Sequence, residues 1–269
     1  MEALRQVADW PAQLAAVAVL APGRELASTG PRDVELRWAS VTKLLTTLAI
    51  LVAVEEGAVD LDEPAGPPGA TLRHLLAHAA GLPPDDPTPI APPGSRRIYS
   101  NSGIEAAAEH VAAAAGIPFA DYFRDAVLAP LALRGRLRSS PAWGYAGPLD
   151  DLAALAAELL EPTLVAPETL AEATTVQFTG LRGVLPGFGR QEPNDWGLGF
   201  ELRDAKSPHW TGSRNSSRTF GHFGASGTFL WVDPDARLAC ACLTDLEFGP
   251  WAVEAWPRLS DAVLAGAVG

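Results

Sequence analysis

The sequence predicts an α/β fold of the α+β type, with helices flanking one antiparallel sheet and a mainly helical part inserted between its strands. Strand-like segments occur near both ends, at 15–29 and 194–245, whereas the middle of the chain has helical spacing. One sheet built from both ends of the chain requires an insertion rather than two consecutive domains. We therefore expect 1–57 and 170–269 to form the sheet part, and 58–169 the inserted part.

The first elements are a strand pair and a buried helix. Residues 15–29 alternate small and apolar side chains and break at Pro22-Gly23, which predicts strand, tight turn and strand. After Ser40, a typical N-cap residue, some fourteen residues are almost wholly apolar and end at Glu55-Glu56-Gly57. A helix without a polar face is buried on every side, so we expect it in the middle of the fold.

The remaining elements follow in order. A Pro/Gly-rich loop, a short helix ending at Gly81 and a second Pro-rich loop come next, and such loops are either functional or plain surface excursions. The spacing then predicts helices and strands. The helices are 101–133, 148–160 and a closing helix 252–268, and the strands lie within 194–204, 218–234 and 236–245.

Composition excludes several classes of function. The 269 residues include 20 basic and 32 acidic side chains, which gives a net charge of −12 that repels phosphate backbones and anionic lipids. We therefore expect no nucleic-acid partner and no membrane association. A long apolar run at 44–54 contains two threonines and is far shorter than a membrane span of about 20 residues. The N-terminal residues lack the basic start of a secretory signal, so a cytoplasmic location is expected. The oligomeric state is left open.

Cysteines and histidines give no sign of a metal. Cys240 and Cys242 are two residues apart on a predicted strand, which puts both on one face as reduced core residues. His74 and His78 are spaced for one helix face, but Leu75 stands where a zinc-protease helix carries glutamate. We interpret them as helix histidines satisfied by neighbours, and we expect no metal and no cofactor.

The first candidate motif is Ser40-Val41-Thr42-Lys43. A spacing of three brings the hydroxyl and the amine together on the first helical turn. A buried lysine loses its proton more readily and can activate a serine nucleophile. The alternative is a capped helix with the lysine reaching outward. Of the 20 basic residues only Lys43 and Lys206 are lysines, so an amine leading a wholly apolar helix favours chemistry.

The second motif is Tyr99-Ser100-Asn101, between a Pro-rich loop and a helix. A phenol near a lysine relays a proton, and an amide can orient both lysine and substrate. The alternative is that Asn101 only caps the helix. The third motif is His222-Phe223-Gly224, where glycine permits close backbone approach and a strand edge offers N–H groups to an oxyanion. Its alternative is a glycine-rich turn with a surface histidine.

Together the three motifs arise by chance in roughly one or two such chains per thousand. In this order they resemble the penicillin-recognising serine hydrolases, in the branch of class C β-lactamases, D-Ala-D-Ala carboxypeptidases and family VIII-type esterases. The likeness extends from residue 34 to 245, including 71–83, 92–123 and 220–245 around the motifs. It implies a β-lactamase-like fold with the site in a cleft between sheet and helical region.

The resemblance also implies roles. Ser40 matches the acylated nucleophile and Lys43 the amine that takes its proton, while Tyr99 shares the acid/base work and Asn101 orients the lysine and the substrate. His222 fills the place of the third motif's lysine or histidine. The backbone N–H groups of Ser40 and Ala225 match the oxyanion hole, and Gly224 and Phe223 are expected to contact substrate.

Histidine at position 222 is more typical of the family's carboxypeptidases and esterases than of true class C β-lactamases. We therefore predict an esterase-like hydrolase that forms an acyl-enzyme on Ser40 and acts on a small ester, amide or β-lactam. A D-Ala-D-Ala carboxypeptidase or amidase, a weak β-lactamase, and a non-catalytic binding or regulatory protein are the alternatives. Four aromatic residues either line an acyl pocket or belong to the core. They are Trp143, Trp196, Trp210 and Phe223.

Overall fold

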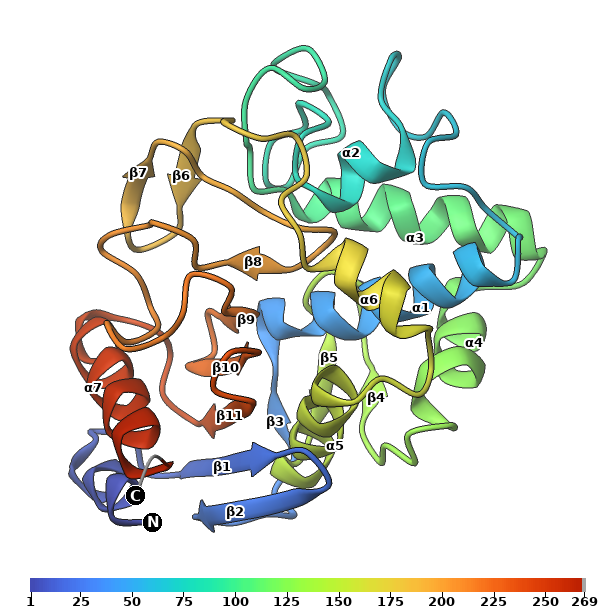
Figure 1. The fold of residues 1–269 in the computed structure, drawn as a ribbon. Helices are drawn as coiled ribbons and strands as arrows, with labels where there is room; N and C mark the ends of the chain where they lie inside the picture. The colour runs from blue at the N-terminus through green and yellow to red at the C-terminus, as the bar shows by residue number, and fades with distance from the viewer. Residues whose placement is uncertain (268–269) are drawn as a thin grey trace.

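A six-stranded sheet from the two ends of the chain forms the centre of the computed structural model, which describes residues 1–267 (Figure 1). Its strand order is β2-β1-β11-β10-β9-β8, and every neighbouring pair is antiparallel. The strands are β1 (Ala15–Ala21), β2 (Arg24–Thr29), β8 (Glu201–Leu202), β9 (Phe220–Gly224), β10 (Thr228–Asp233) and β11 (Leu238–Thr244). The predicted mixed fold with an antiparallel sheet is therefore confirmed.

Helices and short strands surround this sheet. The helices are α1 (Thr42–Glu55), α2 (Leu72–Leu76), α3 (Asn101–Ala115), α4 (Phe119–Phe123), α5 (Leu149–Leu160), α6 (Pro167–Ala173) and α7 (Pro250–Ala267), with short turns η1 (Glu2–Asp9), η2 (Ala39–Val41) and η3 (Arg124–Leu128). The short strands are β3 (Leu36–Arg37), β4 (Arg136–Leu137), β5 (Tyr145–Gly147), β6 (Gly183–Leu185) and β7 (Gly189–Gln191). The closing helix was expected to reach Val268, which lies outside the described residues.

Two cores lie on opposite faces of the sheet. Because side chains alternate along a strand, Val17 and Val19 of β1 pack toward α7, while Ala16 and Ala18 face the core that contains α1 and α5. Helix α1 lies in that second core with most of its residues buried, as its all-round apolar sequence predicts. The two cysteines are buried and reduced on β11, also as predicted.

Several boundaries differ from the prediction. The short helix ends at Leu76 instead of 81, because the chain turns through a left-handed conformation at His78 (φ 54°). The helical stretch 101–133 breaks at Gly116 (φ 71°), and the strand within 194–204 is two residues long. Helix α5, which our boundaries put in the inserted part, packs against β1 and β11. The boundaries of the two parts stay a prediction.

Within residues 1–267, none of the helices combines the length and the apolar character that crossing a bilayer demands.

Candidate active site

Ser40 lies in the tight turn η2, immediately before α1, and not at the helix N-cap. The N-cap residue is Val41, whose apolar side chain makes no capping hydrogen bond. The predicted capping role of Ser40 is therefore wrong. Ala39 precedes it with φ 45°, a conformation that residues other than glycine rarely adopt. The turn therefore holds the serine hydroxyl in a fixed position at the N-terminus of the buried helix.

Lys43 is fully buried in the first turn of α1, so the outward-reaching alternative is wrong. Its Nζ lies 3.4 Å from Ser40 Oγ and donates to Asn101 Oδ1 at 2.6 Å and to the Ala142 carbonyl at 2.9 Å. Burial lowers the pKa of Lys43 to about 7, against the opposing attraction of the carboxylates of Glu105 and Asp85. Near neutral pH a large fraction of this amine is unprotonated and can accept a proton.

Tyr99 completes the contact with the serine. Its hydroxyl donates to Ser40 Oγ at 2.7 Å, and Lys43 Nζ lies 4.7 Å from the centre of its ring. Burial raises the pKa of Tyr99 well above its ordinary value, so the phenol stays protonated. Ser40 Oγ thus has a neutral hydroxyl on one side and an amine of lowered pKa on the other.

Asn101 connects the lysine to a carboxylate that the sequence did not reveal. Its Oδ1 accepts from Lys43, and its Nδ2 donates to Asp85 Oδ1 at 2.8 Å, which fixes the orientation of the amide. The cap of α3 is Ser100, whose hydroxyl accepts from the Gly103 N–H at 2.9 Å. The alternative that Asn101 only caps the helix is therefore wrong.

His222 lies near Tyr99 without a hydrogen bond to Ser40 among the described residues. Its ring centre is 5.7 Å from that of Tyr99 and 5.5 Å from that of Trp196. Burial, and then the charge of Lys43, lower the pKa of His222 to about 3, although its hydrogen bond to the Phe223 carbonyl opposes this. The imidazole is therefore neutral near pH 7. It is also buried, so the alternative of a surface histidine is wrong.

A second histidine, His78, packs against the same aromatic rings as His222. Its ring packs against Tyr99 at 4.8 Å and Trp196 at 4.7 Å, and its Nδ1 accepts from the Ser100 N–H at 3.2 Å. His78 Nε2 therefore carries the proton, whereas His222 uses Nδ1–H and has a bare Nε2. Both Nε2 atoms are buried without a partner among residues 1–267, so the expectation of satisfied histidines fails for His78.

A comparison with protein families places the chain. The family model described as Beta-lactamase matches residues 14–264, nearly the whole chain. The chain belongs to the beta-lactamase family. Its fold is that of the penicillin-recognising serine hydrolases, which confirms the resemblance drawn from the three motifs.

Individual relatives of this family member differ in what they are called. A crystal structure named a beta-lactamase (Mb2281c) from Mycobacterium bovis is 52% identical, with TM-score 0.97 over 98% of this chain and 99% of that one. EstCE1, a hydrolase with promiscuous acyltransferase activity, is 19% identical with TM-score 0.77 over 97% of this chain and 96% of that one, and shows likeness of fold alone. The D-alanyl-D-alanine-carboxypeptidase/endopeptidase AmpH of Escherichia coli is 28% identical over 139 residues, 38% of this chain. The match spans about a third of AmpH, 36% of its length.

In this beta-lactamase fold, the third motif approaches the serine through its glycine. A Cβ at Gly224 would lie 2.5 Å from the Trp38 carbonyl oxygen and 3.2 Å from the Ser40 backbone nitrogen, so only glycine lets β9 come this close. The next residue, Ala225, is exposed beside that turn. The strand end and the serine turn therefore lie side by side, as an oxyanion hole built from two backbone N–H groups requires.

Phe223 lies elsewhere than expected. Alternation along β9 turns its ring to the sheet face covered by α7, where it packs 6.0 Å from Trp256 and 5.6 Å from Trp210. Trp196 and Trp210 are buried as well, so three of the four aromatic candidates are core residues. Trp143, in contrast, is 46% exposed and lines a cavity.

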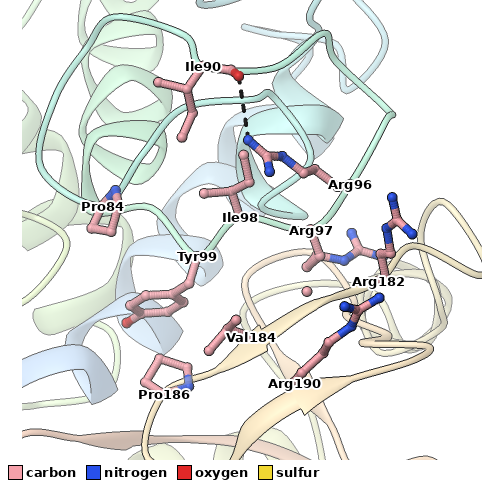
Figure 2. Close-up of a pocket in the computed structure, with 11 residues that line it drawn as sticks. Pro84, Ile90, Arg96, Arg97, Ile98, Tyr99, Arg182, Val184, Pro186 and Arg190 are labelled. Atoms are coloured by element: carbon pink, nitrogen blue, oxygen red, sulfur yellow. Dashed lines mark hydrogen bonds between the residues drawn. The ribbon is translucent and has the colours of Figure 1, made fainter.

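Two cavities are lined by neighbours of Ser40, one by Tyr99 and the other by Ala39. The larger, of about 570 Å³, is bordered by Tyr99, and Figure 2 shows arginine side chains around it. The smaller, of about 170 Å³, is bordered by Ala39, Ala225 and Trp143. Across residues 1–267, no three His, Cys, Asp or Glu side chains are grouped to hold a metal ion.

Proposed function

We propose that the protein is a serine hydrolase with esterase-like activity that forms an acyl-enzyme on Ser40. The observation that carries this proposal is the double contact of Ser40 Oγ, with the Tyr99 hydroxyl at 2.7 Å and Lys43 Nζ at 3.4 Å. A buried amine with a pKa of about 7 supplies the base that a serine needs to become a nucleophile.

Acylation follows from this geometry. Ser40 Oγ attacks the carbonyl carbon while its proton passes to unprotonated Lys43, directly or through the Tyr99 hydroxyl. The backbone N–H groups of Ser40 and Ala225 hold the oxyanion of the tetrahedral intermediate. When the intermediate collapses, the bond between the carbonyl carbon and the leaving oxygen breaks. The leaving alkoxide takes the proton from the Lys43–Tyr99 pair, which titrates as a unit.

Deacylation reverses these roles. A water attacks the acyl carbonyl and gives its proton to the pair, and Ser40 leaves with that proton as a hydroxyl. Asn101 keeps the amine in place in both steps, because its amide is held by Asp85.

The neutral state of His222 favours esters over the family's other substrates. Penicillins and D-Ala-D-Ala peptides carry a carboxylate close to the scissile bond, and an imidazole at position 222 with a pKa of about 3 offers no positive charge to a carboxylate there. Two further candidates have specific support. β-Lactam hydrolysis is suggested by the name of the 52% identical structure, and D-Ala-D-Ala cleavage by the partial match to AmpH.

Labelling with a fluorophosphonate tests the nucleophile. We expect the wild type to gain one covalent label, and the Ser40→Ala variant to gain none. Ser207→Ala, which removes an exposed hydroxyl elsewhere, is the matched control and should label normally. An unlabelled wild type would support the non-catalytic binding protein, and a labelled Ser40→Ala variant would move the nucleophile to another residue.

A parallel rate panel then separates the activities. The substrates are a chromogenic short-chain ester, a chromogenic cephalosporin and a D-Ala-D-Ala peptide, each also measured with Ser40→Ala. We expect the largest kcat/KM on the ester. Faster turnover of the cephalosporin or the peptide would replace the esterase proposal with the corresponding alternative. The cytoplasmic location stays a prediction.

A further inference from the structure

We propose that the larger cavity recognises an anionic group carried by the ester, held by the guanidinium groups of Arg182 and Arg190. This inference rests on the proposed function, and it adds the class of substrate: an ester with a carboxylate or phosphate several atoms from the scissile bond. The cavity is linked to the reacting serine through Tyr99, which lines the cavity and donates to Ser40 Oγ.

The cavity lining is divided into an apolar and a cationic part. Figure 2 shows apolar side chains near Tyr99 and the guanidinium groups of Arg182 and Arg190 on the other side of the opening. The apolar lining residues are Pro84, Ile90, Ile98, Val184 and Pro186. Such a surface is complementary to a molecule with an apolar chain and a negative end.

The β6–β7 hairpin presents the two arginines together. Val184 and Arg190 are directly paired across the hairpin, and Arg182 precedes Val184 by two residues, so all three share one face. The hairpin is tied to the Tyr99 segment, since the Arg97 N–H donates to the Arg182 carbonyl at 2.9 Å. The anion site is therefore held in a fixed position relative to the catalytic tyrosine.

These arginines have donors to spare. Among residues 1–267 the Arg182 guanidinium has no side-chain partner, and Arg190 makes only one contact, of 3.1 Å with the exposed carboxylate of Glu192. Arg96, at the rim, donates to the Ile90 carbonyl at 3.4 Å. The guanidinium of buried Arg97 donates to backbone carbonyls. Arg97 therefore adds positive charge behind the cavity without being a ligand.

The charge of the whole protein makes this grouping informative. A net charge of −12 repels anions at long range, yet three exposed arginines border this one cavity. A single exposed arginine on a protein surface does not indicate a binding site. Several arginines around one cavity next to a nucleophile favour anionic ligands over neutral ones.

The test compares esters with and without a negative charge. The charged substrates are the 4-nitrophenyl monoesters of adipic, suberic and sebacic acids, and each neutral partner has its free carboxylate capped as a methyl ester. We expect kcat/KM to favour the charged ester by about tenfold at the best chain length, as one charge-assisted contact in a partly exposed site provides. A second arm, 4-carboxyphenyl and 4-phosphonooxyphenyl butyrates against phenyl butyrate, places a carboxylate or a phosphate on the alcohol side.

Variants assign the preference to the arginines. In Arg182→Gln/Arg190→Gln the ratio of charged to neutral rates should fall to about one, while Arg182→Lys, which keeps the charge, should retain most of it. Arg258→Gln is the matched control, because Arg258 is also an exposed arginine paired with a glutamate, far from the cavity on α7. A ratio near one for wild type in both arms, or a ratio that survives the double substitution, overturns the inference.

Binding measured on Ser40→Ala keeps the inference separate from the proposed function. By titration calorimetry, suberic acid monoamide should bind about tenfold tighter than neutral suberamide, and the double arginine substitution should remove the difference. If no ester is hydrolysed but this difference is found, the esterase proposal fails and the anion site stands. If esters are hydrolysed without regard to charge and the two amides bind equally, the anion site fails alone.

Discussion

Replacing the buried amine by a thioether of similar size, Lys43→Met, should abolish activity and change how stability depends on pH. The amine has its ordinary pKa of 10.5 when the chain is unfolded and a pKa of about 7 in the fold. Between pH 7 and 10.5 the unfolded state therefore binds more protons, so the wild type gains stability as pH rises through this window. A methionine at position 43 has no proton to exchange and removes this dependence.

The magnitude follows from the two pKa values. At pH 7 the proton equilibrium favours unfolding by about 4 kcal/mol, and at pH 9 by about 2 kcal/mol, since each tenfold change in proton affinity corresponds to about 1.4 kcal/mol. The substitution also removes hydrogen bonds to Asn101 and to the Ala142 carbonyl, at about 1–2 kcal/mol each. We expect Lys43→Met to be similar to or more stable than the wild type at pH 7, and to lose about 2 kcal/mol of that relative stability by pH 9.

Urea unfolding of both proteins at pH 7, 8 and 9 provides the measurement. Subtracting the wild-type free energy of unfolding from that of the variant cancels the titration of all other groups. A difference that does not change with pH would refute the lowered pKa and, with it, the role of Lys43 as a neutral base. The same variant should lose about a thousandfold or more in kcat/KM on the ester, as the loss of a general base requires.

Three further substitutions test the surroundings of the serine. Asp85→Ala frees the amide of Asn101 and removes a charge that raises the pKa of Lys43, so kcat should fall about tenfold and the acid limb of the pH–rate profile should move to lower pH; an unmoved limb would contradict this. His222→Lys buries an ammonium beside Lys43 and should cost about 3 kcal/mol or more in urea unfolding, whereas His222→Gln should cost less. Gly224→Ala puts a methyl group 2.5 Å from the Trp38 carbonyl oxygen, so the acylation rate in a stopped-flow burst should drop and about 1–3 kcal/mol of stability should be lost; wild-type acylation would show that β9 can move away freely.

The parts of the site that depend on local spacing could be predicted from the sequence. Ser40 and Lys43 are three residues apart, and one turn of chain brings them within reach whether it is 3-10 or α-helical. The helix character of α1 followed from its all-round apolar composition. What spacing could not show was the exact start of the helix, because the cap is a matter of backbone conformation at Ala39 and Val41.

The parts that depend on long-range packing could not be predicted. Asp85 lies in a Pro-rich loop without periodicity, and only the folded chain brings it to Asn101. The sequence pattern put His78 on a helix face. In the fold His78 itself has a left-handed backbone, and its ring therefore packs against Tyr99 and Trp196. The Arg182 and Arg190 pair depends on the register of a two-stranded hairpin of three residues per strand, which is too short to leave a pattern in the sequence.

The scarcity of lysine identified the site only in part. Both lysines of the chain are buried. The small number of lysines is therefore explained by a preference for arginine on the surface, and this does not distinguish Lys43 from Lys206. Their contacts differ. Lys206 forms a buried ion pair with Glu201 and also donates to the Asp195 carbonyl at 2.6 Å. Among residues 1–267, Lys43 Nζ has only neutral oxygens within hydrogen-bond distance.

That difference separates a structural lysine from a candidate base. Burial lowers the pKa of both amines, but the carboxylate in contact with Lys206 opposes the shift and holds its proton in place. Lys43 faces an amide, a carbonyl and a serine hydroxyl, none of which carries a charge to retain the proton, so its pKa falls to about 7. A rare lysine therefore indicates a buried amine, and the absence of a carboxylate within hydrogen-bond distance of Nζ in residues 1–267 indicates which amine is able to accept a proton.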